Sequence, residues 1–187
     1  MSEHRLHRAA QTLGAAASLA GRGNSSLPTR HWVASVQAEA CAGLGDRKAC
    51  ERAMDQAGTV RDVAADSTDG GWLRFGCARL AEERGACHVQ LGCLDLAEQA
   101  LQDALRQTAL TSGQSYRRRG TVLTGLAAIG AKRRDAEQVV TYGGEAVGLA
   151  GASSSGYVAR RLRALCDEFG PLSRDRRVAE LGRRSPR

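Results

Sequence analysis

The sequence predicts an all-α protein built from antiparallel helix pairs. The clearest sign is the stretch from Cys77 to Gln107, which reads as two amphipathic helices joined by a tight turn at residues 91–93. In its second half, apolar residues recur at spacings of three and four, so they share one helix face. The chain is rich in alanine and arginine and is 4% aromatic. That composition suits close-packed helices and gives little β-branched density from which to build a sheet.

The other elements follow from apolar periodicity and from turn residues. A first helix is predicted over residues 2–20, a loop over 21–28, a helix pair over 30–59 and a polar connector over 60–71. A third pair follows over 114–130 and 133–150, then a loop over 151–156, a helix over 157–169 that Pro171 ends, and a short helix over 173–182. The predicted organisation is an N-terminal capping helix and loop (1–29), a repeat domain (30–182) and a basic tail (183–187).

Glycines mark the predicted turns between paired helices. Gly45 can accept a positive φ, and Gly45, Gly92 and Gly130 are 47 and 38 residues apart (45 to 92, 92 to 130). The chain has 22 glycines, and some, such as Gly143 and Gly144, fall inside a helical pattern. Each should cost about 1 kcal/mol relative to alanine, so we expect modest stability.

Small and large residues alternate in the central pair in a recognisable order. Gly85 and His88 precede the turn at Gly92, and Ala97, Leu101 and Ala104 follow it. This pattern resembles the tetratricopeptide repeat, in which small residues let helices approach and large ones fill the gaps between neighbouring pairs. The resemblance implies a right-handed superhelical array of antiparallel helix pairs, an α-solenoid.

A longer resemblance covers roughly residues 30–182. The stretches GWLRFGCARLAEERGACHVQLGCLDLAEQAL and SYRRRGTVLTGLAAIGAKRRDAEQVVTYGGEAVGLA are similar to the C-terminal tetratricopeptide-repeat domain of actinobacterial (Streptomyces-like) helix-turn-helix transcriptional regulators. In that family a DNA-binding domain comes first, and residues 1–29 are too short to hold it. The run Arg117–Arg119 also departs from the family's alternating arginine and aspartate.

The resemblance implies a cytoplasmic protein-interaction or ligand-sensing module of a transcriptional regulator. A peptide or protein partner would lie in a concave groove, a homodimer is a further expected partner, and DNA would be affected indirectly. Trp32, next to His31, is open to two interpretations, as a binding residue or as core or end packing. By repeat position, the residues predicted to line the groove are Trp32, Glu39, Arg79, Glu82, Gln90 and Arg118.

Two alternatives remain open. The net charge is +7, and the stretch from Tyr157 onward holds nine arginines and four acidic residues, so a basic surface could bind nucleic acid directly. No aromatic residues are interleaved with these arginines for stacking on bases, and a solvated tail explains them as well. The residues predicted to contact nucleic acid are Arg117, Arg118, Arg119, Arg183 and Arg184. The other alternative is a degenerate remnant of a regulator, with unstable glycine-containing helices.

Other classes of function have little support in the sequence. No nucleophile motif or metal-binding HExxH pattern occurs, and the run Gly125–Lys132 lacks the Lys and Ser or Thr that a phosphate loop needs after its second glycine. We therefore predict no enzymatic activity, no cofactor and no metal. Six cysteines without CxxC or zinc-finger spacing are predicted to be reduced and buried. No apolar run reaches the length of a membrane span.

Overall fold

The computed structural model describes residues 3–22, 28–64, 77–106, 116–153 and 156–185. Among these residues every regular element is a helix and no strand occurs, so the all-α prediction is confirmed. The chain divides into two compact units, Met1–Cys93 and Leu94–Arg187. The division falls inside the stretch predicted as one repeat domain, directly after the turn at Gly92. The superhelical stacking of all pairs stays a prediction.

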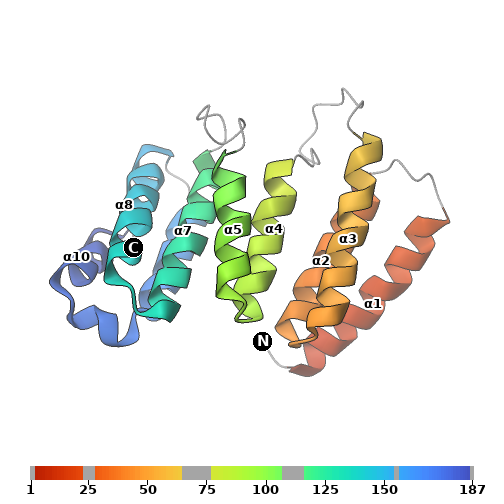
Figure 1. The fold of residues 1–187 in the computed structure, drawn as a ribbon, viewed down its shortest axis with the longest axis horizontal. Coiled ribbons are helices and arrows are strands. Elements are labelled where there is room, and N and C mark those ends of the chain that lie inside the picture. Colours follow the sequence, from red (N-terminus) through yellow and green to blue (C-terminus); the bar gives the residue numbers. More distant parts are fainter. Residues whose placement is uncertain (1–2, 23–27, 65–76, 107–115, 154–155, 186–187) are drawn as a thin grey trace. The chain divides into compact units, whose positions relative to one another are not determined.

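In the described part of the first unit there are four helices. They are α1 (Glu3–Gly21), α2 (Pro28–Gly43), α3 (Arg47–Ala64) and α4 (Cys77–Gln90). Helix α2 contacts each of the other three, and Figure 1 shows α2 and α3 side by side. Gly45 joins them with a φ of 75°, as predicted, and the Asp46 carboxylate then accepts a hydrogen bond from the Ala49 amide (3.0 Å). A left-handed glycine followed by an aspartate cap explains why one helix ends and the next begins here.

Small side chains fill the core of the first unit. Ala38 and Ala57 are both fully buried, which lets the backbones of α2 and α3 approach closely. The buried cluster consists of Ala34, Ala38, Cys41, Ala42, Cys50, Ala53, Met54, Ala57, Leu80 and Cys87. Its three thiols are free and buried, as predicted, whereas the thiols of Cys93 and Cys166 are half-buried. Cysteine therefore serves here as a small apolar residue.

The second unit contains five α-helices and one short 3-10 helix among its described residues. They are α5 (Leu94–Arg106), α7 (Tyr116–Arg133), α8 (Ala136–Ser153), α9 (Gly156–Asp167), η1 (Gly170–Arg174) and α10 (Arg176–Arg184). Helix α7 contacts α5, α8 and α9, and α10 packs on α8 (Figure 1). The core joins apolar residues of α7 to α10 and includes the fully buried Leu123, Val139 and Leu162. On α5, Ala97, Leu101 and Ala104 are buried as the periodicity predicts.

Several glycines inside these helices lie where another side chain approaches the backbone. A Cβ atom at Gly143 would lie 2.5 Å from Leu181 Cδ2, and one at Gly120 would lie 2.8 Å from Val158 Cγ2. Both distances are shorter than carbon atoms tolerate, so glycine is the residue that allows α10 and α9 to pack at these points. Gly144 differs, because nothing lies within 4 Å of its Cβ position.

Helix boundaries are where the sequence predictions fail most. Helix α3 continues to Ala64 into the predicted connector, α8 continues to Ser153 into the predicted loop 151–156, and α10 includes Arg183 and Arg184 of the predicted tail. Gly156 begins α9 one residue early. The aromatic residues Trp72, Phe75 and most of the connector lie outside the described residues. Helix ends are the boundaries that sequence patterns fix least well, within one or two residues at best.

The third turn is at Arg134 and not at Gly130. Gly130 is buried inside α7, where a Cβ atom would lie 2.9 Å from Gln138 Cβ. Arg134 has a φ of 60°, and Asp135 caps α8 by accepting a hydrogen bond from the Gln138 amide (3.0 Å). The turn residues are therefore 47 and 42 residues apart (45 to 92, 92 to 134). The left-handed position followed by a capping aspartate repeats the arrangement at Gly45 and Asp46.

Candidate functional site

The predicted groove residues fall on three helices and differ in exposure. Trp32 and Glu39 lie on α2 and are exposed, Trp32 at 43%. On α4, Gln90 is exposed while Arg79 and Glu82 are half-buried. Arg118 lies on α7 in the second unit and is half-buried. Five of the six predicted residues thus belong to the first unit.

The outer side of α2 is a continuous stripe of one helix face. Trp32, Val36, Glu39 and Gly43 are spaced by four, three and four residues, so these positions lie along one line. Leu6 of α1 approaches the Gly43 end of this line. Trp32, Glu39 and Gly43 are exposed and Val36 is half-buried. Trp32 is therefore not a core residue, whereas the neighbouring His31 is buried at 1% exposed. An exposure of 43% fits both a binding residue and partly buried end packing of Trp32.

His31 holds α2 against α3 and α4. Its Nδ1 atom lies 2.8 Å from the carbonyl oxygen of Ala57 on α3. A carbonyl oxygen accepts hydrogen bonds and cannot donate them, so Nδ1 carries a proton. Its Nε2 atom lies 3.6 Å from Glu83 Oε2 on α4. One buried side chain therefore links three helices.

Glu83 is the centre of a mostly buried polar cluster on the inner side of the same helices. Its Oε1 atom accepts a hydrogen bond from Arg79 Nε (2.7 Å), and Ser35 on α2 is buried beside it. Burial is the largest influence and opposes ionisation of Glu83, but His31, Ser35 and Arg79 together outweigh it. They hold the pKa of Glu83 below its ordinary value. The carboxylate is therefore charged at neutral pH, and Arg79 forms an ion pair with it.

No sequence pattern predicts this cluster. Glu82 is the residue predicted for the candidate surface, whereas Glu83 is the acidic residue that reaches His31 on α2. The cluster has a histidine, a serine and a carboxylate, but His31 Nδ1 is occupied by a backbone carbonyl and Ser35 is 5% exposed. A substrate has no access to a buried hydroxyl of this kind, so the arrangement serves to position α2.

The buried thiols of Cys41 and Cys87 offer no reactive nucleophile. The hydrogen bond with Cys87 lowers the pKa of the third buried thiol, Cys50, but Cys50 is 1% exposed and a substrate cannot reach it. Cys87 is 3% exposed, and its hydrogen bond with Cys50, together with burial, raises the pKa of the Cys87 thiol well above its ordinary value. Burial likewise raises the pKa of Cys41. A thiol with a raised pKa stays protonated at neutral pH and reacts slowly. These cysteines therefore contribute to packing.

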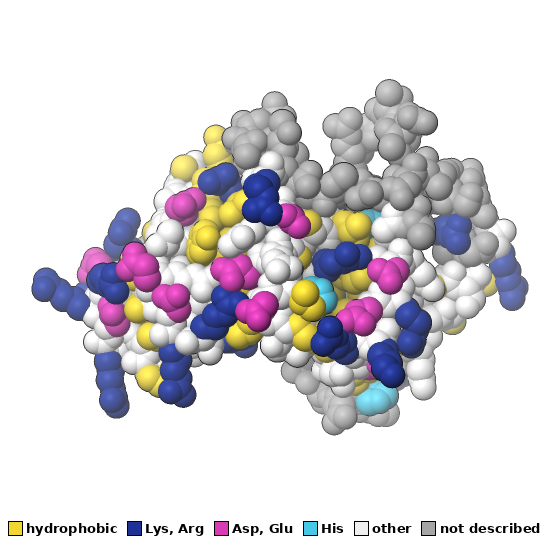
Figure 2. Space-filling view, in the orientation of Figure 1, with side chains coloured by type: hydrophobic (Ala, Val, Ile, Leu, Met, Phe, Trp, Pro, Cys, Tyr) yellow, Lys and Arg dark blue, Asp and Glu magenta, His cyan; other side chains and the backbone are white. Residues whose placement is uncertain are grey.

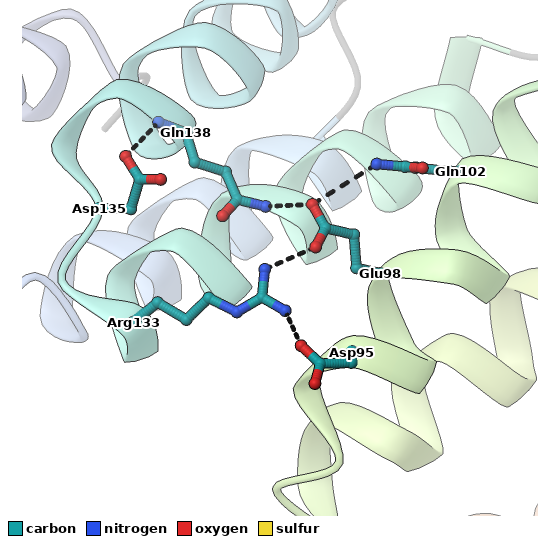
Figure 3. A network of polar contacts seen from close by, with 6 residues as sticks. All are labelled: Asp95, Glu98, Gln102, Arg133, Asp135 and Gln138. Atoms are coloured by element: carbon teal, nitrogen blue, oxygen red, sulfur yellow. Dashed lines mark hydrogen bonds and ion pairs between the residues drawn. The ribbon is translucent and has the colours of Figure 1, made fainter.

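A polar network ties α5 to the turn between α7 and α8 (Figure 3). The guanidinium of Arg133 forms ion pairs with both Asp95 and Glu98, and Gln138 Nε2 donates to Glu98 Oε1 (3.0 Å). The hydrogen bond from Arg133 to Glu98 is the largest influence on the pKa of Arg133, which is raised. Each of its side chains bonds to another member or to the adjacent backbone, so the network is a structural clamp.

The residues predicted to contact nucleic acid lie in two places, in α10 and at the start of α7. Arg183 forms a hydrogen bond of 2.6 Å with Glu180 in α10, and Figure 2 shows acidic side chains interspersed with basic ones around the α10 end of the second unit. Arg117 and Arg119 lie at the start of α7, where Arg119 pairs with Glu145 (3.2 Å). The guanidinium of Arg117 lies 4.2 Å from the ring centroid of Tyr157. The sequence shows no aromatic residues interleaved with these arginines, but the fold brings Tyr157 of α9 against Arg117.

Within the described ranges, no group of three or more His, Cys, Asp or Glu residues could hold a metal ion. None of the described helices combines the length and apolar character that crossing a bilayer requires. No protein-family model, curated protein or solved structure matches this chain.

Proposed function

We propose that this chain is a non-enzymatic helical-repeat module that binds a peptide or protein partner, and that it is related to the sensing half of a transcriptional regulator. Three tight turns between consecutive helices support the repeat character. Each has a turn residue in the left-handed region: Gly45, Gly92 and Arg134. Modules of this kind bind extended or helical peptides on the exposed faces of their helices. The relation to regulators rests on the sequence resemblance.

The observation that carries the binding function is the exposed indole of Trp32 on a helix that cannot rotate. His31, one position earlier, is fixed between Ala57 and Glu83, so the Cα–Cβ bond of Trp32 points in a fixed direction. A tryptophan that is 43% exposed is costly in water and is among the residues that contribute most at protein interfaces. Because the helix that carries Trp32 is held in place, binding has to order its side chain but not its backbone.

Glu39 and Gln90 give this surface polar character. Glu39 follows Trp32 on the same face of α2, and Gln90 is an exposed residue at the end of α4. The expected partner is therefore a segment with an apolar side chain for Trp32 and a basic group for Glu39. In the regulator hypothesis, such a partner changes the packing of α2 against α4 and so changes a DNA-binding unit elsewhere.

The experiment is affinity capture from a lysate of the source cells, followed by titration with the purified partner. The Trp32→Ala variant should weaken binding at least tenfold, which corresponds to about 1.4 kcal/mol. The matched control is Leu19→Ala, which removes an apolar side chain that is 66% exposed on α1. Capture that persists in Trp32→Ala and is lost in Leu19→Ala would reject the α2 surface.

A further inference from the structure

Three arginines surround one tyrosine ring in the second unit. The guanidinium carbons of Arg117, Arg160 and Arg161 lie 4.2, 5.9 and 6.0 Å from the ring centroid of Tyr157. Arg117 comes from the second position of α7 and Tyr157 from the second position of α9. Gly120 keeps the two helices close, because Val158 lies against its backbone. We call Tyr116, Arg117, Tyr157, Arg160 and Arg161 the basic-aromatic patch.

The positive charge of this patch is not balanced locally. Residues 116–131 and 156–166 hold six arginines and no acidic residue. Glu145 of α8 pairs with Arg119, but no described carboxylate forms an ion pair with the three guanidiniums around Tyr157. Elsewhere in the unit, Arg133 and Arg177 do have carboxylate partners. Like charges held this close repel one another, and a bound polyanion would remove that repulsion.

The patch also has flat surfaces that bases can stack on. Tyr116, directly before Arg117, leaves 50% of its surface exposed. Arg117 lies over Tyr157 and is itself exposed, so its planar guanidinium is a second stacking surface. Stacking on aromatic rings and guanidinium planes beside a positive surface is how proteins bind unpaired nucleotides.

We infer that the basic-aromatic patch binds single-stranded nucleic acid, with phosphates at Arg117, Arg160 and Arg161 and a base stacked on Tyr116. An acidic peptide would neutralise the three arginines but would leave the exposed ring of Tyr116 without a stacking partner. A duplex would hide its base faces from Tyr116. This inference does not depend on the proposed partner site on α2, which uses different residues in the other unit.

The test is fluorescence anisotropy of the full chain with a labelled oligonucleotide of about 12 nucleotides, both oligo-dT and oligo-U. We expect binding at about 50 mM salt that weakens steeply toward 200 mM. Tyr116→Ala should weaken it roughly tenfold, the loss of one stacked base. Arg117→Gln should weaken it and reduce the steepness of the salt dependence by about one ionic contact.

Two controls keep charge loss and misfolding apart from the proposed contacts. Arg174→Gln removes one exposed arginine in η1, which follows the opposite end of α9 from Tyr157, and it should bind as the unaltered chain does. Trp32→Ala removes an exposed aromatic residue of the first unit and should also have no effect. Circular dichroism of each variant should show unchanged helix content.

Several results would overturn the inference. These are no binding at low salt, equal loss of binding in Arg174→Gln and Arg117→Gln, or a Tyr116→Ala variant that binds normally. Equal affinity for a duplex of the same length, or for a polyglutamate peptide, would mean that the patch binds polyanions in general and does not select single-stranded nucleic acid. A negative result in this test would not contradict the proposed partner site at Trp32, because the capture experiment uses neither the oligonucleotide nor the patch.

Discussion

The Nε2 atom of His31 on α2 lies 3.6 Å from Glu83 Oε2 on α4, inside the helices that carry Trp32 on their outer side. The same imidazole reaches the Ala57 carbonyl on α3 through Nδ1. Burying a polar group of this kind costs folding free energy when the group has no partner. When it has partners, they fix one arrangement of the helices around it. The contact therefore fixes the rotation of α2, and with it the direction of Trp32.

Replacing Glu83 by glutamine should destabilise the first unit. Glu83→Gln keeps the shape of the side chain but removes the charge that His31 and Arg79 face. We expect the free energy of unfolding to fall by about 1–3 kcal/mol, the usual cost of leaving buried polar groups poorly paired. Urea denaturation followed by circular dichroism measures it. Glu39→Gln, on the exposed face of α2, should change stability by less than about 0.5 kcal/mol, and equal effects of the two variants would contradict a role for the cluster.

Acid should destabilise the first unit in two stages. Burial, aided by the nearby Arg84, lowers the pKa of His88 from its ordinary 6.5, so the folded state binds this proton less readily than the unfolded state. The contribution of His88 is complete above pH 6.5 and is lost as the pH falls below it. The pKa of Glu83 is lowered from 4.5, so its contribution is complete above pH 4.5 and is lost at more acidic pH.

Urea unfolding midpoints between about pH 8 and pH 5 isolate the first stage, because Glu83 stays ionised there. The unaltered chain should lose stability as the pH falls through this range. His88→Gln should show a shallower decline, since glutamine does not titrate. A decline of the same slope in His88→Gln would assign the effect to another group.

The two adjacent glycines of α8 should respond to alanine with opposite signs. At Gly144 nothing lies within 4 Å of the added Cβ atom, so Gly144→Ala should stabilise the helix by about 0.5–1 kcal/mol. At Gly143 the Cβ atom would lie 2.5 Å from Leu181 Cδ2, and Leu181 is buried. Overpacking of about 1–3 kcal/mol should exceed the gain in helix propensity. Thermal denaturation of both variants checks this, and stabilisation by Gly143→Ala would mean that α10 does not pack there.

The sequence allowed prediction of features whose causes are local. Gly45 and Gly92 mark turns because glycine adopts a positive φ freely, and the faces of α5 follow from the spacing of its apolar residues. The turn at Arg134 could not be found this way, since arginine rarely adopts a φ of 60° and Gly130 was the nearer glycine. The preference for Gly130 was wrong because that glycine is needed for packing against Gln138.

The candidate sites depend on contacts between distant residues and were largely missed for that reason. His31 contacts a carbonyl 26 residues away, and no periodicity indicates which of Glu82 and Glu83 faces it. The arginine run at 117–119 was visible in the sequence, but its aromatic partner Tyr157 lies on another helix. Exposure of Trp32 was also undecided, because a tryptophan beside a histidine fits a core as well as a surface.

A double-mutant cycle on Arg133 should separate two ion pairs that look alike in Figure 3. The carboxylate of Glu98 is 25% exposed and is also bonded to Gln138, whereas the side chain of Asp95 is 92% exposed. Water screens an exposed pair, so the Arg133–Asp95 coupling should be below about 0.5 kcal/mol. The Arg133–Glu98 coupling should reach about 1 kcal/mol, since less solvent surrounds it.

The cycle uses Arg133→Ala, Glu98→Ala, Asp95→Ala and the two double variants, each measured by urea denaturation. Asp95 lies in the first turn of α5, where a negative charge also favours the helix, but the cycle cancels that contribution because it is present with and without Arg133. Raising the salt concentration should reduce the Asp95 coupling more than the Glu98 coupling. Equal couplings with equal salt dependence would mean that burial does not distinguish the two carboxylates, and that α5 is held to the α7–α8 turn by its apolar face.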